Sequence, residues 1–319
     1  MNFRARMVFG FLALALLGAA SAPALSGQLI RFIVPVPPGA STDFIARLMA
    51  AQIGATEGVD VIVENRPGAS GTIGTEFVAR QAPDGNTVLI TAGTYLIDAQ
   101  IRKTPYHPVN DFEPLCSLVQ SPAVLVVPQS SPYRSLGDLL KDSREPGRVS
   151  IAGIGPGSSF QLGLIELISK SNAQITFVPY PGSAPVVTDT MGGHVSGGIA
   201  GFSVVSAGLK AGQLRALAVA AEQRMTPLPD VPTFAESGFP TVQMDNWFGA
   251  IVPAKTPAEV ATRLIGWLKA AMSAAEVKQK VEAQGLYPVL TCGADFADLI
   301  QKRYAAYGLA IKQAGLKTE

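Results

Sequence analysis

The stretch Arg31-Phe-Ile-Val-Pro-Val-Pro-Pro38-Gly-Ala-Ser-Thr-Asp43-Phe-Ile-Ala-Arg-Leu48 has the pattern of a strand, a glycine turn and the start of a helix. A second stretch, Val149-Ser-Ile-Ala-Gly-Ile-Gly155-Pro-Gly-Ser-Ser-Phe160-Gln-Leu, has the same order of features. The first N–H groups of a helix lack intrahelical partners, and together with the helix dipole they can hold an anion without a basic side chain. Two such loops, far apart in the chain, predict two lobes that close on one small anionic ligand.

Short β-branched runs alternate with helical patterns along most of the chain. These runs are too apolar to show alternation, which is typical of strands covered on both faces of an α/β sheet. Strands are expected at Leu29–Val34, Asp60–Glu64, Thr87–Thr91, Ala123–Val127, Val149–Ala152, Ile175–Pro179, Val195–Ile199, Arg215–Ala220 and Trp247–Val252. Amphipathic helices are expected at Asp43–Ile53, at Ser159–Ser169, from the N-cap Thr256, from Ser273 onward, and over Asp295–Ala314.

This alternation predicts an α/β protein of two lobes, a Venus flytrap clamshell with a mixed, mostly parallel sheet in each lobe. There is no long linker, so we expect the chain to cross between the lobes twice, near Ser121–Pro128 and near Gln243–Gly249. Lobe 1 would then comprise residues 25–124 and 247–319, and lobe 2 residues 125–246.

The amino terminus has the three-part layout of a secretory signal peptide, residues 1–24. Arg4 and Arg6 precede an uncharged apolar run, which small residues close at Ala22-Pro23-Ala24. Cleavage after Ala24 is preferred to cleavage after Ala22, which would place Pro23 beside the scissile bond. The alternative is a short membrane anchor, but the run is below the roughly 20 residues that a span needs. The chain is therefore expected in the periplasm.

Composition excludes several classes of partner. The formal net charge is +1 over 319 residues, which argues against a nucleic-acid or membrane-surface partner. A high content of Val, Ile, Leu and Ala excludes disorder.

Cys116 and Cys292 can form a disulfide in an oxidising compartment, and the alternative is two buried free thiols. His107 and His194 stand alone and neither cysteine has a partner at ligand spacing, so no metal site is expected.

The first loop, Pro35–Asp43, offers several groups to a ligand. Gly39 permits a turn that a side chain would obstruct, and Ser41 or Thr42 can cap the helix. Asp43 lies in the first helical turn, where the dipole favours a carboxylate. That carboxylate would repel an anion, so it either holds the loop or receives a ligand ammonium group. An ordinary βα turn without a ligand is the alternative.

The second loop differs from a dinucleotide-binding turn. The third glycine of G-x-G-x-x-G falls on Ser158, and the following strand lacks the ribose-binding acid, so no nucleotide cofactor is expected. The hydroxyls of Ser158 and Ser159 add hydrogen-bond donors to this loop. Catalytic motifs such as G-x-S-x-G and H-E-x-x-H are absent from the sequence. The chain is therefore predicted not to be an enzyme.

Several motifs, in order along the chain, resemble the periplasmic solute-binding receptors of tripartite tricarboxylate transporters, also called Bug receptors. The resemblance covers Leu29 to Gly315. The motifs are Pro35-Val-Pro-Pro-Gly-Ala-Ser-Thr-Asp43-Phe-Ile-Ala-Arg47, Glu64-Asn-Arg-Pro-Gly-Ala-Ser-Gly71, Pro83-Asp-Gly85, Asn110-Asp-Phe-Glu-Pro114, Val178-Pro-Tyr-Pro-Gly182, Gly212-Gln-Leu-Arg-Ala-Leu-Ala218 and Leu228-Pro-Asp-Val-Pro-Thr-Phe-Ala-Glu236. The family usually has Gly-Gly where this chain has Gly39-Ala40, which predicts a narrower first loop.

The resemblance implies a clamshell that holds a carboxylated ligand by backbone amides and ordered waters, and delivers it to the membrane components of the transporter. Carried over by position, it implies contacts from the first loop, from the second loop and from two residues that line the cleft: Gly39, Ala40, Ser41 and Asp43; Gly157, Ser158 and Ser159; Thr94 and Gly182. A monomer without cofactors is expected. A periplasmic sensor for a signalling protein, or a cleft enzyme acting on a small organic acid, are the alternatives, and the ligand is not named by the sequence.

Overall fold

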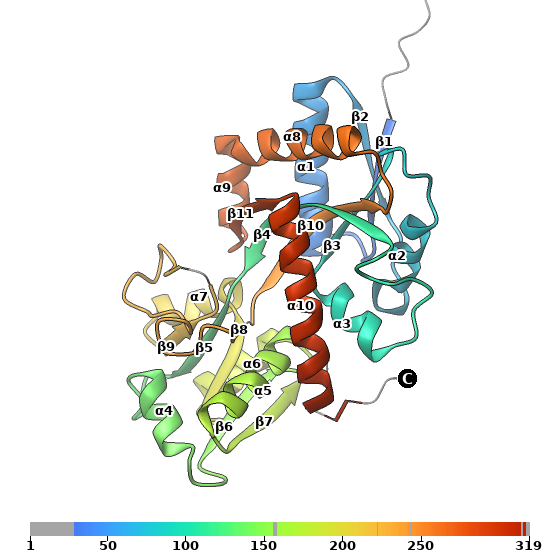
Figure 1. The fold of residues 1–319 in the computed structure, drawn as a ribbon. Coiled ribbons are helices and arrows are strands. Elements are labelled where there is room, and N and C mark those ends of the chain that lie inside the picture. The colour runs from blue at the N-terminus through green and yellow to red at the C-terminus, as the bar shows by residue number, and fades with distance from the viewer. Residues whose placement is uncertain (1–28, 156–157, 222, 243, 314, 317–319) are drawn as a thin grey trace, which may run out of the picture.

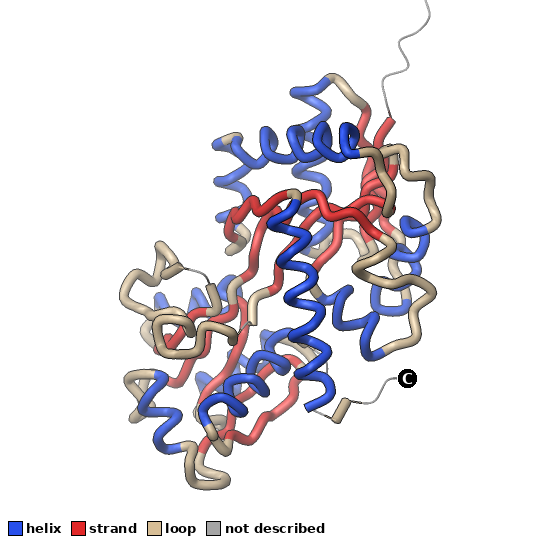
Figure 2. Tube along the Cα trace, in the orientation of Figure 1, coloured by secondary structure: helices blue, strands red, loops and turns tan. Residues whose placement is uncertain are grey.

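The computed structural model describes residues 29–155, 158–221, 223–242, 244–313 and 315–316. Its strands form two sheets, one above the other in Figure 1. The six-stranded sheet and its helices are here called lobe 1, and the five-stranded sheet and its helices lobe 2. Figure 2 shows the strands at the centre of each lobe with helices around them. The predicted α/β clamshell with two lobes is thereby present.

The sheet of lobe 1 is mixed. Its order is β11-β4-β10-β3-β1-β2, where β1 pairs in parallel with β2 and β3, and the remaining ladders are antiparallel. Four of its strands still run in one direction, because β10 is antiparallel to both β3 and β4. The strands are β1 (Leu29–Val34), β2 (Asp60–Asn65), β3 (Thr87–Ala92), β4 (Phe112–Ser121), β10 (Asn246–Pro253) and β11 (Tyr287–Cys292).

The sheet of lobe 2 is also mixed, with the order β7-β6-β8-β5-β9. The strand β6 pairs in parallel with β7 and β8, whereas β5 is antiparallel to both of its neighbours. All strands except β5 therefore share one direction. The strands are β5 (Ala123–Pro128), β6 (Val149–Ile154), β7 (Ile175–Tyr180), β8 (Gly197–Gly201) and β9 (Leu214–Val219).

Helices cover both faces of each sheet, as the apolar strands predict. In lobe 1 one face packs on α1 (Ser41–Glu57), α8 (Ala258–Ser273) and α9 (Ala275–Ala283), and the other on α2 (Thr72–Ala79), α3 (Thr94–Ile101) and α10 (Ala294–Gln313). In lobe 2 one face packs on α4 (Leu136–Asp142) and α5 (Ser159–Ser171), and the other on α6 (Ser183–Met191) and α7 (Phe202–Lys210). The alternating side chains of β1 show this directly, since Phe32 and Ile33 enter opposite cores.

The chain passes between the sheets at two places. The strand β4 ends at Ser121 and β5 begins at Ala123, so a single residue, Pro122, joins them. The return runs from Val219, the end of β9, to Asn246, the start of β10. The first crossing thus precedes the expected boundary at residue 124, because Ala123 already pairs with Gly201 in the lobe 2 sheet.

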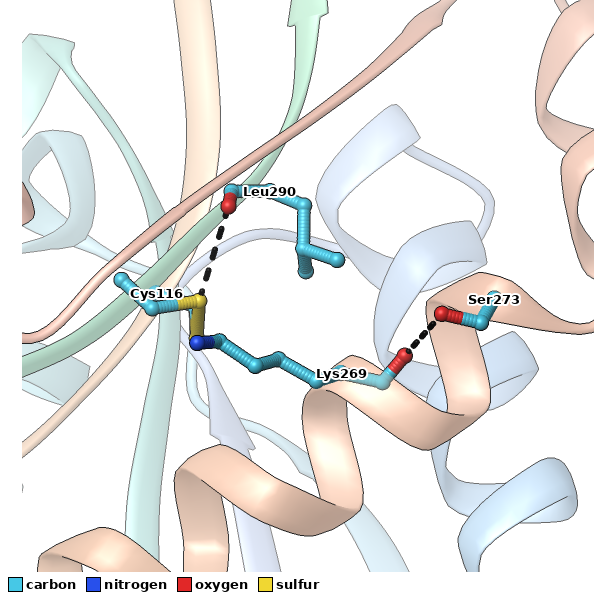
Figure 3. The surroundings of a disulfide bond; sticks show 5 residues. Cys116, Lys269, Ser273 and Leu290 are labelled. Atoms are coloured by element: carbon cyan, nitrogen blue, oxygen red, sulfur yellow. Dashed lines mark hydrogen bonds between the residues drawn. A yellow bond between two sulfur atoms is a disulfide. The ribbon is translucent and has the colours of Figure 1, made fainter.

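A disulfide joins Cys116 of β4 to Cys292 of β11, two residues that also pair in the sheet. Figure 3 shows the bridge beneath β11, with Lys269 and Ser273 of α8 nearby. The sulfur of Cys292 lies 3.8 Å from the carbonyl oxygen of Leu290. Because the bridge spans 176 residues of sequence, it closes a loop that contains the whole of lobe 2.

Candidate functional site

The helix N-termini of the two lobes meet at the same region because of strand direction. In lobe 1 the parallel strands β1, β2 and β3 lead into α1, the short helix η1 (Ala69–Gly71) with α2, and α3. The strand β4 runs the same way and crosses directly to lobe 2, so this edge of the sheet faces lobe 2. In lobe 2, β5 starts opposite the end of β8, at the edge where α5, α6 and α7 begin. The two rows of N-termini therefore face one another, the arrangement in which open α/β sheets bind ligands.

The first mouth comprises residues 35–43, which are the loop after β1 and the first residues of α1. Gly39 has φ +89°, a left-handed conformation that favours glycine. Its N–H donates to Asp43 Oδ2 at 2.9 Å, and Arg47 Nε donates to the same oxygen at 3.0 Å. The side chain of Asn65, at the end of β2, donates to Asp43 Oδ1 at 2.9 Å. The buried carboxylate of Asp43 is thus the centre of a network that holds the loop.

This network determines the electrostatics of the first mouth. Burial by itself would raise the pKa of Asp43, but the hydrogen bonds from Arg47, the Gly39 amide and Asn65 outweigh it and lower the pKa. The carboxylate is therefore ionised and fully engaged within the protein. Of the two roles considered for Asp43, the structure shows the loop-holding one.

The start of α1 has no side-chain cap. Ala40 occupies the N-cap position with extended backbone, and Phe44 is the residue whose N–H reaches the Ala40 carbonyl. Neither Ser41 nor Thr42 caps the helix, contrary to the cap predicted from the sequence, because both lie inside its first turn. The N–H groups of this turn, including that of the exposed Ser41, are left to water or a ligand.

The second mouth lies between β6 and α5, where Gly157 is outside the described residues. Ser158 is the N-cap of α5, and its Oγ accepts from the N–H of Gln161 at 3.1 Å. The same hydroxyl donates to the carbonyl of Ile154. Ser159 is the first helical residue and is buried. The hydroxyl of Ser158 therefore fixes the loop, and its backbone N–H is the group left for a ligand.

Two further predicted residues stand at helix starts. Thr94 opens α3 and is exposed. The preceding Gly93 donates its N–H to the carbonyl of Trp247 at 2.9 Å, and a Cβ at Gly93 would lie 2.7 Å from Trp247 Nε1. Gly182 is the N-cap of α6 in extended backbone, and a Cβ there would meet nothing within 4 Å. Gly182 thus borders open space, and a larger residue at this position would cause no steric clash through its Cβ.

The charged groups beside the mouths are paired. Arg66 Nε donates to Glu64 Oε1 at 2.8 Å, and its guanidinium lies 3.6 Å from the centre of the Phe77 ring. This arginine therefore supports the loop after β2. Asn65 was not singled out in the sequence, although the Asn of Glu64-Asn-Arg-Pro-Gly directly follows a strand, which is the signal that could have identified it.

Within the described ranges, no cluster of His, Cys, Asp and Glu is arranged to hold a metal ion. No helix among the same residues is long and apolar enough to span a membrane.

The groups that the two mouths present are backbone N–H groups at helix starts, and such groups bind anionic oxygen atoms.

Comparison with known proteins agrees with this geometry. Residues 45–316 match the model of the tripartite tricarboxylate transporter family receptor, TctC. The chain belongs to this family. It is 33% identical to protein BugT of Bordetella pertussis over 302 residues, covering 93% of this chain and 92% of BugT. The family predicted from the motifs is thereby confirmed.

Solved structures show the same fold. A TctC solute-binding protein from Polaromonas without ligand has a TM-score of 0.83 at 26% identity, over 89% of this chain and 98% of that one. Rpa4515 of R. palustris, solved with adipate, has a TM-score of 0.69 at 31% identity, over 90% and 97%. MatC from Rhodopseudomonas palustris, solved with malate, has a TM-score of 0.65 at 25% identity, over 89% and 98%. The receptor is thus a two-lobe periplasmic solute-binding protein of a transporter, in a family of receptors rather than enzymes.

Proposed function

We propose that this receptor captures a small carboxylate between the two mouths and delivers it to the membrane components of a tripartite tricarboxylate-type transporter. The observation that carries the proposal is the uncapped start of α1 facing the row of N-termini on lobe 2, while the nearby Asp43 and Arg66 are each paired within the protein. Backbone N–H groups are then the donors that a carboxylate meets. The bound adipate and malate of two structural neighbours support a carboxylate as ligand.

The ligand contacts proposed on lobe 1 are the backbone of Gly39, Ala40 and Ser41, with Thr94 beside them. Asp43 contributes by holding this loop. On lobe 2 the backbone of Gly157, Ser158 and Ser159 would meet the same carboxylate, with Gly182 bordering the rest of the ligand. Contacts to the two mouths and to Gly182 are available together only when the lobes approach, so a ligand that makes them all favours closure.

The proposal also includes export to the periplasm, with cleavage of the signal peptide near Ala24. The receptor is proposed to act as a monomer. A periplasmic sensor would bind the same class of ligand, and would be distinguished by a membrane signalling protein rather than a carrier as its partner.

The first test is a thermal-shift screen of the mature protein with adipate, malate, citrate, acetate and benzoate. Binding to the native state alone raises the melting temperature by mass action. Protein purified, denatured and analysed by mass spectrometry would show a ligand that already occupies the cleft. Conversion of any of these acids would establish an enzyme. No shift and no co-purified acid would overturn the proposal.

A proline substitution tests whether the backbone N–H groups of the first mouth bind the ligand. Ser41→Pro removes one N–H at the first position of α1, where proline is well tolerated, and the extended backbone of Ala40 accommodates a following proline. Loss of a hydrogen bond to a charged ligand should weaken binding about ten- to a hundredfold. Ser41→Ala keeps the N–H and should bind normally. Ala275→Pro, at the first position of α9 and far from the mouths, is the matched control. Equal affinity of Ser41→Pro and wild type would exclude the first mouth.

A further inference from the structure

The C-terminal helix α10 contacts both lobes. It packs along α3 and β4 of lobe 1, and its second half lies beside α5 of lobe 2 (Figure 1). The contact with α5 is apolar: Tyr307 and Ile311 of α10 belong to the same buried cluster as Leu162 of α5. The lobes are therefore joined by a non-covalent contact in addition to the two chain crossings.

Leu162 is unusual in this cluster. It is 2% exposed, and every other fully buried member comes from lobe 1. Ile165, one turn further along α5, packs against the same cluster. By contrast, the neighbouring Leu164 and Leu167 point into the core of lobe 2. The helix α5 thus uses one face to build lobe 2 and another to dock on lobe 1.

A buried ion pair fixes α10 at the second crossing. Arg303 Nη2 donates to Asp245 Oδ1 at 2.6 Å, and both side chains are almost fully buried. Asp245 directly precedes β10, so the pair ties α10 to the chain segment that returns from lobe 2. Breaking one partner of a buried pair leaves an uncompensated charge, so this link resists separation.

We propose that α10 is a pivot: lobe 2 rotates about the contact between α5 and α10, and this contact persists when the cleft closes. Separating the contact would expose the buried Leu162 to water, which opposes any motion that opens it. A rotation about this contact leaves the start of α5, and with it the second mouth, nearly in place. The helices α6 and α7 cover the opposite face of the lobe 2 sheet from α5, so they move furthest.

The pivot also affects ligand binding, and this part of the inference rests on the proposed function. The second mouth lies one turn from Leu162, so the contact with α10 fixes its position relative to lobe 1 before any ligand binds. Loosening the pivot would lower the fraction of molecules that can bind, and the apparent affinity falls by that fraction. Gly182 and the start of α6 then form the part of the cleft that closes over the ligand.

A ligand-free experiment tests the pivot by itself. Spin labels are placed at the exposed positions Leu309 of α10 and Lys170 of α5, with the native disulfide kept oxidised, and the distance distribution is measured. Leu162→Ala should broaden this distribution. Leu164→Ala, the same change two residues away in the lobe 2 core, is the matched control and should leave it narrow. Equal distributions in the two variants would overturn the proposal, whether or not a ligand is known.

A second label pair tests the motion with malate and with adipate. The pair Leu309 and Thr188 reports the movement of α6, while Leu309 and Lys170 report the pivot. We expect saturating ligand to shift the first distance and to leave the second unchanged, and Leu162→Ala to bind roughly three- to tenfold more weakly. A shift of both distances would show that the contact opens on closure and would refute a pivot. If neither acid binds wild-type protein, the acid found by the thermal-shift screen replaces them, and the ligand-free comparison decides the pivot by itself.

Discussion

The side-chain amide of Asn65 donates to Asp43 Oδ1 at 2.9 Å and to the carbonyl of Val36 at 3.1 Å. One residue at the end of β2 thereby joins the start of α1 to the loop that follows β1. The first mouth is shaped by this polar network, since the residues that precede Asp43 in it are three prolines, a valine and small residues. Each member of the network should therefore affect both the stability of the fold and the geometry of the mouth.

Asp43→Asn should destabilise the protein in a pH-dependent way. The folded-state pKa of Asp43 lies below its ordinary value, so the native carboxylate contributes stability above that ordinary value and loses it as pH falls through the folded pKa. We expect the free energy of unfolding to drop by about 1–3 kcal/mol at pH 7, the range for a hydrogen-bonded charged group. The difference from wild type should shrink toward pH 3. Urea unfolding at both pH values measures this, with the exposed Asp60→Asn as control.

Gly39→Val should abolish ligand binding while the protein still folds. No atom lies within 4 Å of a Cβ built at Gly39, so the effect comes from its φ of +89° and not from a clash. A β-branched residue there costs about 1–2 kcal/mol or moves the loop, which displaces the N–H groups of the mouth. Calorimetric titration measures the affinity. Gly212→Val has the same left-handed strain and open surroundings away from the mouths, and should bind normally. Unchanged affinity in Gly39→Val would contradict the assignment.

The Cys116–Cys292 bridge should contribute strongly to stability. A crosslink restricts the unfolded chain, and the effect grows with the length of the closed loop, which spans 176 residues here. The double variant Cys116→Ala with Cys292→Ala should lose about 3–5 kcal/mol of unfolding free energy. Urea unfolding with and without dithiothreitol checks this: reductant should bring wild type to the level of the variant and leave the variant unchanged. A thiol assay that finds free cysteine in native, oxidised protein would contradict the bridge.

The sequence predicted most of the elements because their signals are local. The strand Leu29–Val34 and the starts of the strands at Asp60 and Thr87 agree with the structure, since buried β-branched runs bounded by turns need no tertiary information. The strands β4 and β11 were missed. Each contains a proline, Pro114 or Pro288, and a proline is confined to strand starts, edges and irregular pairing. Both lie where the ladders shift register, and β11 is the edge strand that the disulfide holds against β4.

The position of the site could be predicted from the sequence, but the hydrogen bonds within it could not. The glycine turns and helix starts at Gly39 and Ser158 can be recognised from consecutive residues. The partners of Asp43 cannot, because Asn65 reaches it only when β1 and β2 pair. The same holds for the cap at the start of α8, which was predicted at Thr256: its hydroxyl instead donates to the Pro253 carbonyl at 2.7 Å. Local patterns identify which groups are available, and tertiary packing decides which of them are used.

Asp98→Asn, in α3, should stabilise the protein above pH 6, which is the opposite of the effect expected for Asp43→Asn. Burial raises the pKa of Asp98 to about 6, although Arg102 at 3.9 Å acts in the other direction. A carboxyl that binds its proton more tightly in the native state destabilises that state as pH rises from about 4 to 6. Asp98→Asn removes this cost, so the variant should be more stable than wild type by about 1–3 kcal/mol at pH 8 and equal to it at pH 4. Urea unfolding at the two pH values is the measurement, and Asp298→Asn, an exposed aspartate of α10, should change little at either. A variant less stable than wild type at pH 8 would show that the charged form of Asp98 is stabilised by its surroundings.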